Sequence, residues 1–214
     1  MQKVYFISGL GADKRAFSFL DLSFCEPVFV DWISPLKKES LPGYALRLRQ
    51  QIKEEHPMIV GVSFGGMLAT EMAKADNQMK AIIIASNKSA GEFPAYLRLA
   101  KYFPVYKWLP GKLLKAGRLN CILGAKGNEQ KKLLRSILAD SNPAFLKWAI
   151  GAILNWKEKT IPANVLHIHG TADKLLPCRY VKADFKIAGG THLMSINKPK
   201  EISALLQQLV QLSL

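Results

Sequence analysis

The chain has 214 residues, of which 49% are hydrophobic, and carries a formal net charge of +14 at neutral pH. That length and composition support one sizeable core and exclude a disordered chain. No apolar run approaches the roughly 18–20 residues of a membrane span, and the N-terminus enters a strand without a signal-peptide pattern, so we expect a cytoplasmic protein without membrane insertion.

Strand patterns alternate with helical patterns along the chain, which is typical of a mainly parallel sheet covered on both faces. Apolar residues at helical spacing occupy residues 41–52 and 202–210. The expected strands lie at residues 3–8, 27–32, 58–62, 80–85, 164–169 and 183–187. The predicted fold class is therefore α/β, with about six mostly parallel strands flanked by helices.

The third expected strand runs directly into Gly61-Val62-Ser63-Phe64-Gly65, and a helical pattern follows at once. This is the strand–turn–helix context in which G-x-S-x-G forms a nucleophile elbow. The two glycines allow strand and helix to approach closely, and the strained turn lifts the Ser63 hydroxyl above the end of the sheet. The motif taken alone is also compatible with an ordinary strand–helix connection.

Two further polar residues follow later strands. Asp173 stands in the loop after the fifth expected strand, and His192 stands in the loop after the sixth. The chain order Ser63, Asp173, His192 is the nucleophile–acid–base order of the α/β-hydrolases, and it differs from the orders of two unrelated serine protease folds. Each residue follows the C-terminal end of a strand, where open α/β sheets assemble their sites.

On these motifs the chain resembles a small member of the α/β-hydrolase superfamily over nearly its whole length. The matching blocks are Gly-Val-Ser-Phe-Gly-Gly, His-Gly-Thr-Ala-Asp-Lys-Leu-Leu-Pro and Gly-Gly-Thr-His-Leu. Family members often carry His-Gly-x-Gly after an early strand, whereas this chain has Ser8-Gly9-Leu10-Gly11, which keeps the turn glycines without the usual histidine. Since the first strand begins near residue 3, we expect the two leading strands of the full fold to be absent.

The resemblance implies a serine hydrolase that cleaves a small ester or thioester through an acyl-enzyme, with no metal or organic cofactor. Ser63 would attack a carbonyl carbon after giving its proton to His192, and Asp173 would set the imidazole tautomer. The backbone N–H groups of Leu10 and Phe64 are the expected oxyanion-hole donors, and their side chains would form apolar pocket wall.

Roughly seventy residues separate the fourth and fifth expected strands, far more than an ordinary crossover contains. Helical spacing is visible at residues 133–138 and 146–154, after Asn142-Pro143. The insertion resembles the helical cap of the α/β-hydrolases, which excludes water and shapes the pocket. We therefore expect residues 1–86 and 161–214 to form the hydrolase core and residues 87–160 to form an inserted helical cap.

The positive charge is concentrated in the expected cap. Residues 88–159 contain fourteen Lys and Arg against four acids, which is about +10 of the net charge. A solvated basic face is one interpretation, and attraction of an anionic substrate or an acidic protein is another. No recognised nucleic-acid motif accompanies the charge, so we expect no nucleic-acid partner. The oligomeric state is not predicted.

Several alternatives stay open at this point. The same fold and triad also support lyases and carbon–carbon bond hydrolases, and a non-catalytic ligand-binding protein is a third possibility, against which the intact triad argues. His167 and His169 form an H-x-H pair, but a third metal ligand at suitable spacing is missing, so we interpret them as structural. Cys25, Cys121 and Cys178 lack C-x-x-C spacing and are expected to be reduced thiols.

Overall fold

The computed structural model of the protein describes residues 1–103, 108, 123–125 and 127–212. One parallel sheet runs through the described residues in the order β2–β1–β3–β4–β5–β6. Its strands are β1 (Lys3–Ile7), β2 (Glu26–Phe29), β3 (Met58–Val62), β4 (Lys80–Ile84), β5 (Val165–Gly170) and β6 (Phe185–Ile187). The predicted α/β class and six-stranded parallel sheet are confirmed.

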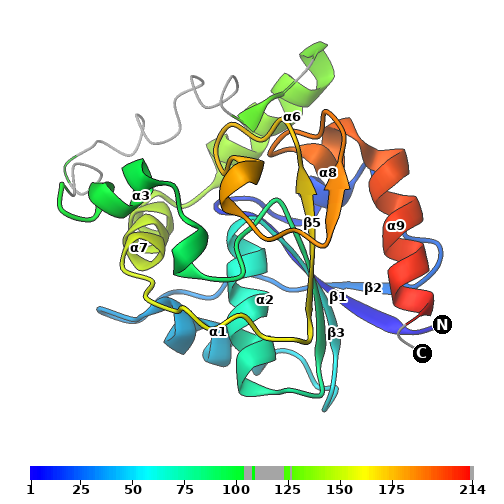
Figure 1. Cartoon of the computed structure of the whole chain (residues 1–214), viewed down its shortest axis with the longest axis horizontal. Coiled ribbons are helices and arrows are strands. Elements are labelled where there is room, and N and C mark those ends of the chain that lie inside the picture. The colour runs from blue at the N-terminus through cyan, green and yellow to red at the C-terminus, as the bar shows by residue number, and fades with distance from the viewer. Residues whose placement is uncertain (104–107, 109–122, 126, 213–214) are drawn as a thin grey trace.

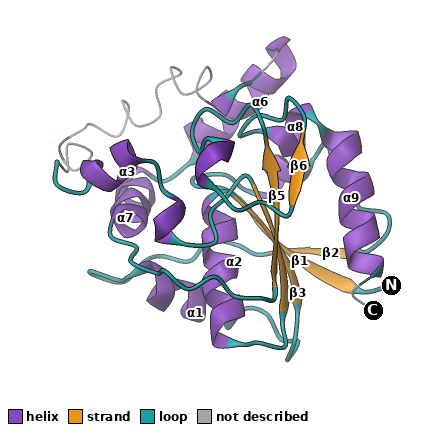
Figure 2. Cartoon of the chain, in the orientation of Figure 1, coloured by secondary structure: helices purple, strands orange, loops and turns teal. Residues whose placement is uncertain are grey.

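Helices connect the strands and cover both faces of the sheet (Figure 2). The α-helices are α1 (Leu41–Arg49), α2 (Phe64–Ala75), α3 (Ala95–Ala100), α6 (Gly127–Asp140), α7 (Pro143–Leu154), α8 (Met194–Asn197) and α9 (Pro199–Gln211). Short 3₁₀-helices are η1 (Lys14–Phe17), η2 (Ala90–Glu92) and η4 (Cys178–Tyr180).

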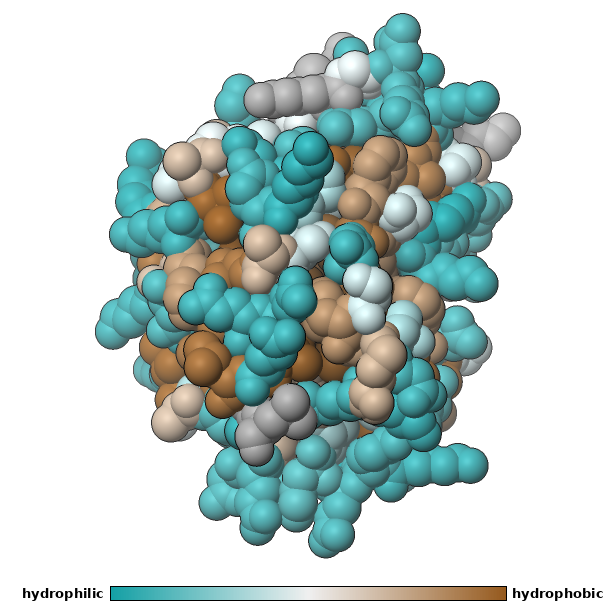
Figure 3. All heavy atoms as spheres, turned by 90° about the vertical axis from the view of Figure 1, so that its right-hand side faces the viewer, coloured by the Kyte–Doolittle hydropathy of each residue, from teal (hydrophilic) through white to brown (hydrophobic). Residues whose placement is uncertain are grey.

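The two faces of the sheet are covered by different helices, as Figure 1 shows, with α1, α2 and α7 on one side and α9 on the other. Strand side chains point alternately to opposite faces. Tyr5 and Ile7 of β1 therefore belong to the core that contains α1, α2 and α7, whereas Val4 and Phe6 belong to the core that contains α8 and α9. The side of the molecule that carries α9 shows hydrophilic side chains around its edge and hydrophobic ones between them (Figure 3).

The second strand is shorter than the sequence pattern predicts, because it ends at Phe29 and not at residue 32. The backbone N–H of Val30 still donates to the carbonyl of Phe6 at 3.0 Å, and the chain then leaves the sheet. Trp32 turns toward the loop that follows β1, where its indole N–H donates to the carbonyl of Ala12 at 2.6 Å. The chain thus leaves the sheet before Trp32 makes this tertiary hydrogen bond.

The long connection from β4 to β5 contains α3, α6 and α7, and its described residues contribute no strand to the sheet. Helix α7 begins where the sequence predicts, because the Asn142 side chain accepts hydrogen bonds from the N–H groups of Ala144 and Phe145. Residues 104–107, 109–122 and 126 of the expected cap lie outside the described residues, as does Cys121. Among the described residues, no helix is both long and apolar enough to cross a membrane.

Candidate active site

Ser63 stands on a strained turn between β3 and α2. Its backbone has φ +52° and ψ −116°, a conformation that non-glycine residues rarely adopt. The turn is too tight for side chains at both flanking positions. A Cβ on Gly65 would lie 2.3 Å from the carbonyl oxygen of Ile7, and a Cβ on Gly61 would lie 2.4 Å from that of Gly65. The buried Ser86 hydroxyl also donates to the carbonyl of Ser63 at 2.7 Å, and this hydrogen bond stabilises the turn.

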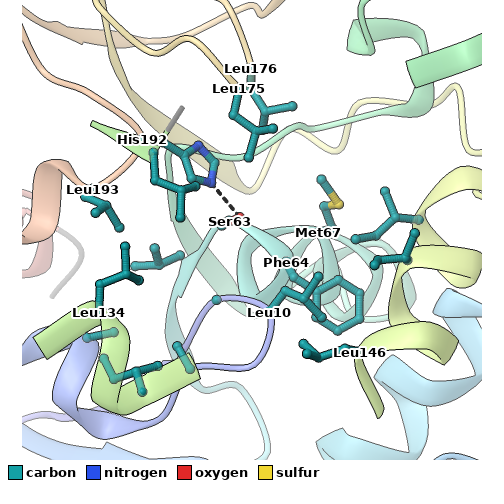
Figure 4. A pocket seen from close by; sticks show the side chains of 18 of the residues that line it. Leu10, Ser63, Phe64, Met67, Leu134, Leu146, Leu175, Leu176, His192 and Leu193 are labelled. Carbon is teal, nitrogen blue, oxygen red and sulfur yellow. Dashed lines mark hydrogen bonds between the residues drawn. The ribbon is translucent and has the colours of Figure 1, made fainter. Parts of the chain in front are cut away.

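The structure brings the three residues of the expected triad together. Asp173 Oδ2 lies 2.8 Å from His192 Nδ1, and His192 Nε2 lies 2.9 Å from Ser63 Oγ (Figure 4). Since an ionised carboxylate can only accept, Nδ1 carries the proton and Nε2 is the acceptor for the serine hydroxyl. Asp173 and His192 are each only 4% exposed. The arrangement is the one required of a serine nucleophile, its base and the acid that orients the base.

The acid is held ionised by its surroundings. Its other oxygen, Oδ1, accepts hydrogen bonds from the backbone N–H groups of Leu175 at 2.8 Å and Leu176 at 2.9 Å. Burial by itself would raise the pKa of Asp173, but the hydrogen bond of His192, the attraction of that ring when it is protonated and the hydrogen bond of the Leu176 amide outweigh it and hold that pKa below its usual value. The carboxylate is therefore available to stabilise a histidinium ion.

The loop after β1 lies beside the nucleophile and forms a closed turn. The N–H of Ala12 donates to the carbonyl of Gly9 at 2.9 Å, with Leu10 and Gly11 at the central positions and Gly11 at φ +68°. A Cβ on Gly9 would lie 3.5 Å from the Cβ of Ser63. In the described part of the chain, neither Leu10 nor Phe64 donates its backbone N–H to another group. Their assignment as oxyanion donors stays a prediction.

Ser8 stands where the resemblance leads one to expect a histidine, and the structure shows what its hydroxyl does. It is buried and donates to the carbonyl of Ala12 at 2.8 Å. That carbonyl also accepts from the indole N–H of Trp32. The loop is therefore held by two side-chain donors. The pattern of motifs did not identify Trp32, because a tryptophan shortly after a strand carries no recognisable spacing signal.

An apolar cavity of about 340 Å³ opens beside Ser63 and His192. Leu10 and Phe64 lie next to Ser63 (Figure 4). The cavity is also lined by leucines from four different segments, Leu134, Leu146, Leu175 and Leu193. The described residues that line the cavity include no Lys, Arg, Asp or Glu. A cavity whose described lining is apolar apart from Ser63, His192 and Ser195 is suited to a ligand with a hydrocarbon group next to a polar one.

His167 and His169 are fully buried in β5 behind the acid. Their rings contact each other, with His167 Nε2 at 3.0 Å from His169 Nδ1, and His169 Nε2 lies 2.7 Å from the carbonyl oxygen of Leu176. Burial lowers the pKa of both rings, that of His167 most strongly. Among the described residues, no group of three or more His, Cys, Asp or Glu side chains is placed to hold a metal ion.

The six-stranded parallel sheet with a strand–serine–helix elbow is the α/β-hydrolase fold. Three solved structures share it, and each alignment covers nearly all of this chain. They are an esterase from Exiguobacterium antarcticum (TM-score 0.76, 14% identity, 99% of this chain and 92% of that one), a thermophilic esterase from Thermogutta terrifontis (0.74, 12%, 100% and 90%) and a lipase-esterase related protein from Clostridium acetobutylicum (0.73, 14%, 97% and 93%).

These similarities confirm the fold that the motifs predicted. No protein-family model matches the chain, and no curated protein matches it either. At identities of 12–14%, the structural neighbours establish a common architecture and leave the reaction to be argued from the site.

Proposed function

We propose that this protein is a serine hydrolase that cleaves an ester or thioester with an apolar acyl group. The observation that carries the proposal is the hydrogen-bonded series Asp173–His192–Ser63 at the wall of an apolar cavity. The names of the structural neighbours, which are esterases and a lipase-esterase related protein, support the same reaction class.

The reaction proceeds in two steps through an acyl-enzyme. Ser63 Oγ bonds to the substrate carbonyl carbon while His192 Nε2 takes the hydroxyl proton. The resulting oxyanion accepts hydrogen bonds from the N–H groups of Leu10 and Phe64. When the intermediate collapses, the carbon–oxygen or carbon–sulfur bond to the leaving group breaks, and His192 returns the proton to the departing alcohol or thiol. Water then attacks the acyl-enzyme by the same sequence, releasing the acid.

Residues 87–160 act in this proposal as a cap that shapes the acyl site. Leu134 and Ile137 of α6, with Leu146 and Ile150 of α7, line the same cavity as Ser63 and His192. A cap that covers the reacting carbonyl excludes water, which strengthens the hydrogen bonds to the oxyanion. The described residues of the cavity wall carry no Lys, Arg, Asp or Glu, which supports an apolar acyl group at this place.

A fluorophosphonate probe combined with a p-nitrophenyl ester assay tests the proposal. The wild-type protein should be labelled and should hydrolyse the ester. Ser63→Ala should abolish labelling and reduce kcat by about 10⁴–10⁶-fold, as removal of a triad serine does elsewhere. Ser203→Ala is the matched control, because the Ser203 hydroxyl lies on α9 and accepts from the N–H of Asp21, far from the elbow in the chain.

Two results would contradict the proposal. One is a folded wild-type protein that neither reacts with the probe nor hydrolyses any ester in a series of increasing acyl length. The other is a Ser63→Ala variant that keeps the hydrolytic activity of the Ser203→Ala control.

A further inference from the structure

Trp32 is joined by a hydrogen bond to the turn that carries one expected oxyanion donor. Its indole N–H donates to the carbonyl of Ala12 at 2.6 Å, and the hydroxyl of Ser8 donates to the same oxygen at 2.8 Å. A carbonyl oxygen has two lone pairs, so these two donors satisfy it fully. The Ala12 N–H donates to the Gly9 carbonyl and so closes the turn that contains Leu10. Fixing the Ala12 carbonyl therefore also fixes the direction of the Leu10 N–H.

The ring of Trp32 contacts the residue that carries the other expected donor. Its centroid lies 5.7 Å from that of Phe64, and it lies 5.1 Å from that of Phe145 on α7. Phe64 is almost completely buried and begins α2 directly after the nucleophile. Figure 4 shows the side chains of Leu10 and Phe64 close together beside Ser63. Trp32 therefore contacts the turn that contains Leu10 through its indole N–H, and the side chain of Phe64 through its ring.

We propose that Trp32 is a positioning residue that sets the separation of the two oxyanion donors; this inference rests on the proposed function. An oxyanion hole works by presenting donors where charge develops, with no reorganisation during the reaction. The substrate carbonyl needs the donors least before attack and most in the transition state. Loosening them therefore lowers kcat and leaves KM nearly unchanged. Ser8 is the second support of the same turn, in the position where related sequences often carry histidine.

The variant Trp32→Phe tests this inference, because it keeps an aromatic ring and removes the N–H donor. Its kcat for a p-nitrophenyl ester should fall about ten-fold or more, since a misplacement of about 1 Å costs roughly 10²-fold, while KM should stay within about two-fold. A boronic acid that forms a tetrahedral adduct with Ser63 should bind the variant more weakly by a factor similar to the loss in kcat.

Trp148→Phe is the matched control. Trp148 belongs to the same aromatic cluster, with its ring centroid 6.1 Å from that of Phe64. Like Trp32→Phe, the variant loses an indole hydrogen bond, in this case the one to the carbonyl of Glu39 at 3.0 Å. That bond does not involve the Ala12 turn. The control should lose comparable thermal stability and keep its kcat within about two-fold of wild type. Ser8→Ala removes the other donor to Ala12, and its kcat should also fall several-fold.

The outcomes separate this inference from the proposed function. A Trp32→Phe variant with wild-type kcat, or one whose kcat falls no further than that of Trp148→Phe, overturns the role of Trp32 while Ser63-dependent hydrolysis stands. If Trp32→Phe does not fold, Ser8→Ala decides, and an unchanged kcat in that variant overturns the inference. A wild-type protein without Ser63-dependent hydrolysis overturns both this inference and the proposed function.

Discussion

A single methyl group added at Gly65 would disturb the site directly. A Cβ at this position would lie 2.3 Å from the carbonyl oxygen of Ile7 and 2.4 Å from that of Ser8, and real Cβ contacts essentially never fall under 3.0 Å. To bring the shorter distance from 2.3 to at least 3.0 Å, the end of β1 and the start of α2 must separate by about 0.7 Å. The end of β1 leads to Leu10, and α2 begins with Phe64, so Gly65→Ala moves the two expected oxyanion donors apart.

The size of the effect follows from that movement. A misplacement of about 1 Å in an active site costs roughly 10²-fold in rate, so kcat of Gly65→Ala should fall by about 30- to 100-fold. Overpacking of this kind typically costs about 1–3 kcal/mol in the free energy of unfolding, which lowers Tm by roughly 2–12 °C for a chain of this size. Ester hydrolysis at saturating substrate and thermal unfolding by circular dichroism measure the two quantities.

A second alanine substitution separates the local clash from a general effect of losing glycine. A Cβ on Gly91 would meet only the hydroxyl oxygen of Ser89, at 3.5 Å, which is ordinary contact. Gly91→Ala should therefore change the free energy of unfolding by less than about 0.5 kcal/mol and leave kcat unchanged. A Gly65→Ala variant with wild-type kcat would refute the reasoning, because the two donors would then tolerate the separation that the added methyl group demands.

Two further predictions concern the cavity and the buried histidines. Each methylene added to the acyl group should raise kcat/KM by up to about four-fold, because its burial contributes roughly 0.8 kcal/mol, until the cavity of about 340 Å³ is filled. A kcat/KM that does not change along a series of p-nitrophenyl esters of increasing acyl length would show that the acyl chain does not bind there. The free energy of unfolding should fall as the pH decreases below about 6.5, because burial lowers the pKa of His167 in the folded protein. The unfolded chain takes up the proton at the ordinary pKa, so His167 contributes a loss of up to about 1.4 kcal/mol per pH unit. His167→Gln should reduce that slope in urea titrations between pH 7 and pH 5.5, and an unchanged slope would contradict the assignment.

The sheet was predictable because its strands are short apolar runs that end in turn residues. β3 begins and ends at the predicted residues, Met58–Val62, since Pro57 precedes it and the Gly61–Gly65 motif follows it. The meeting of Ser63, Asp173 and His192 was predictable for a related reason. Parallel strands place all their C-terminal ends at one edge of the sheet, so residues after three separate strands are brought together whatever their distance along the chain.

The supports of the site were not predictable, because they depend on contacts across the fold. Trp32 and Ala12 are twenty residues apart, and nothing in their spacing indicates that an indole N–H will reach that carbonyl. Trp32 also lies past the observed end of the second strand, whose sequence pattern continues through Val30 to Trp32. Periodicity also assigned Leu134 and Ile137 to a helix, but it did not identify what their face covers. A helix face that packs on a core and one that lines a cavity have the same spacing of apolar residues.

On the proposed function, the charge and the cavity would act at different stages of substrate capture. The formal charge of +14 is distributed over a chain whose described cavity wall carries no Lys, Arg, Asp or Glu. Surface charge acts on approach, over a Debye length of about 10 Å at 0.1 M salt, and it weakens as salt increases. Apolar contact inside the cavity is formed only after entry and does not depend on salt in that way. On the proposed function, a basic exterior would therefore raise the rate of encounter with an anionic substrate, and the apolar walls around Ser63 would discriminate among acyl groups.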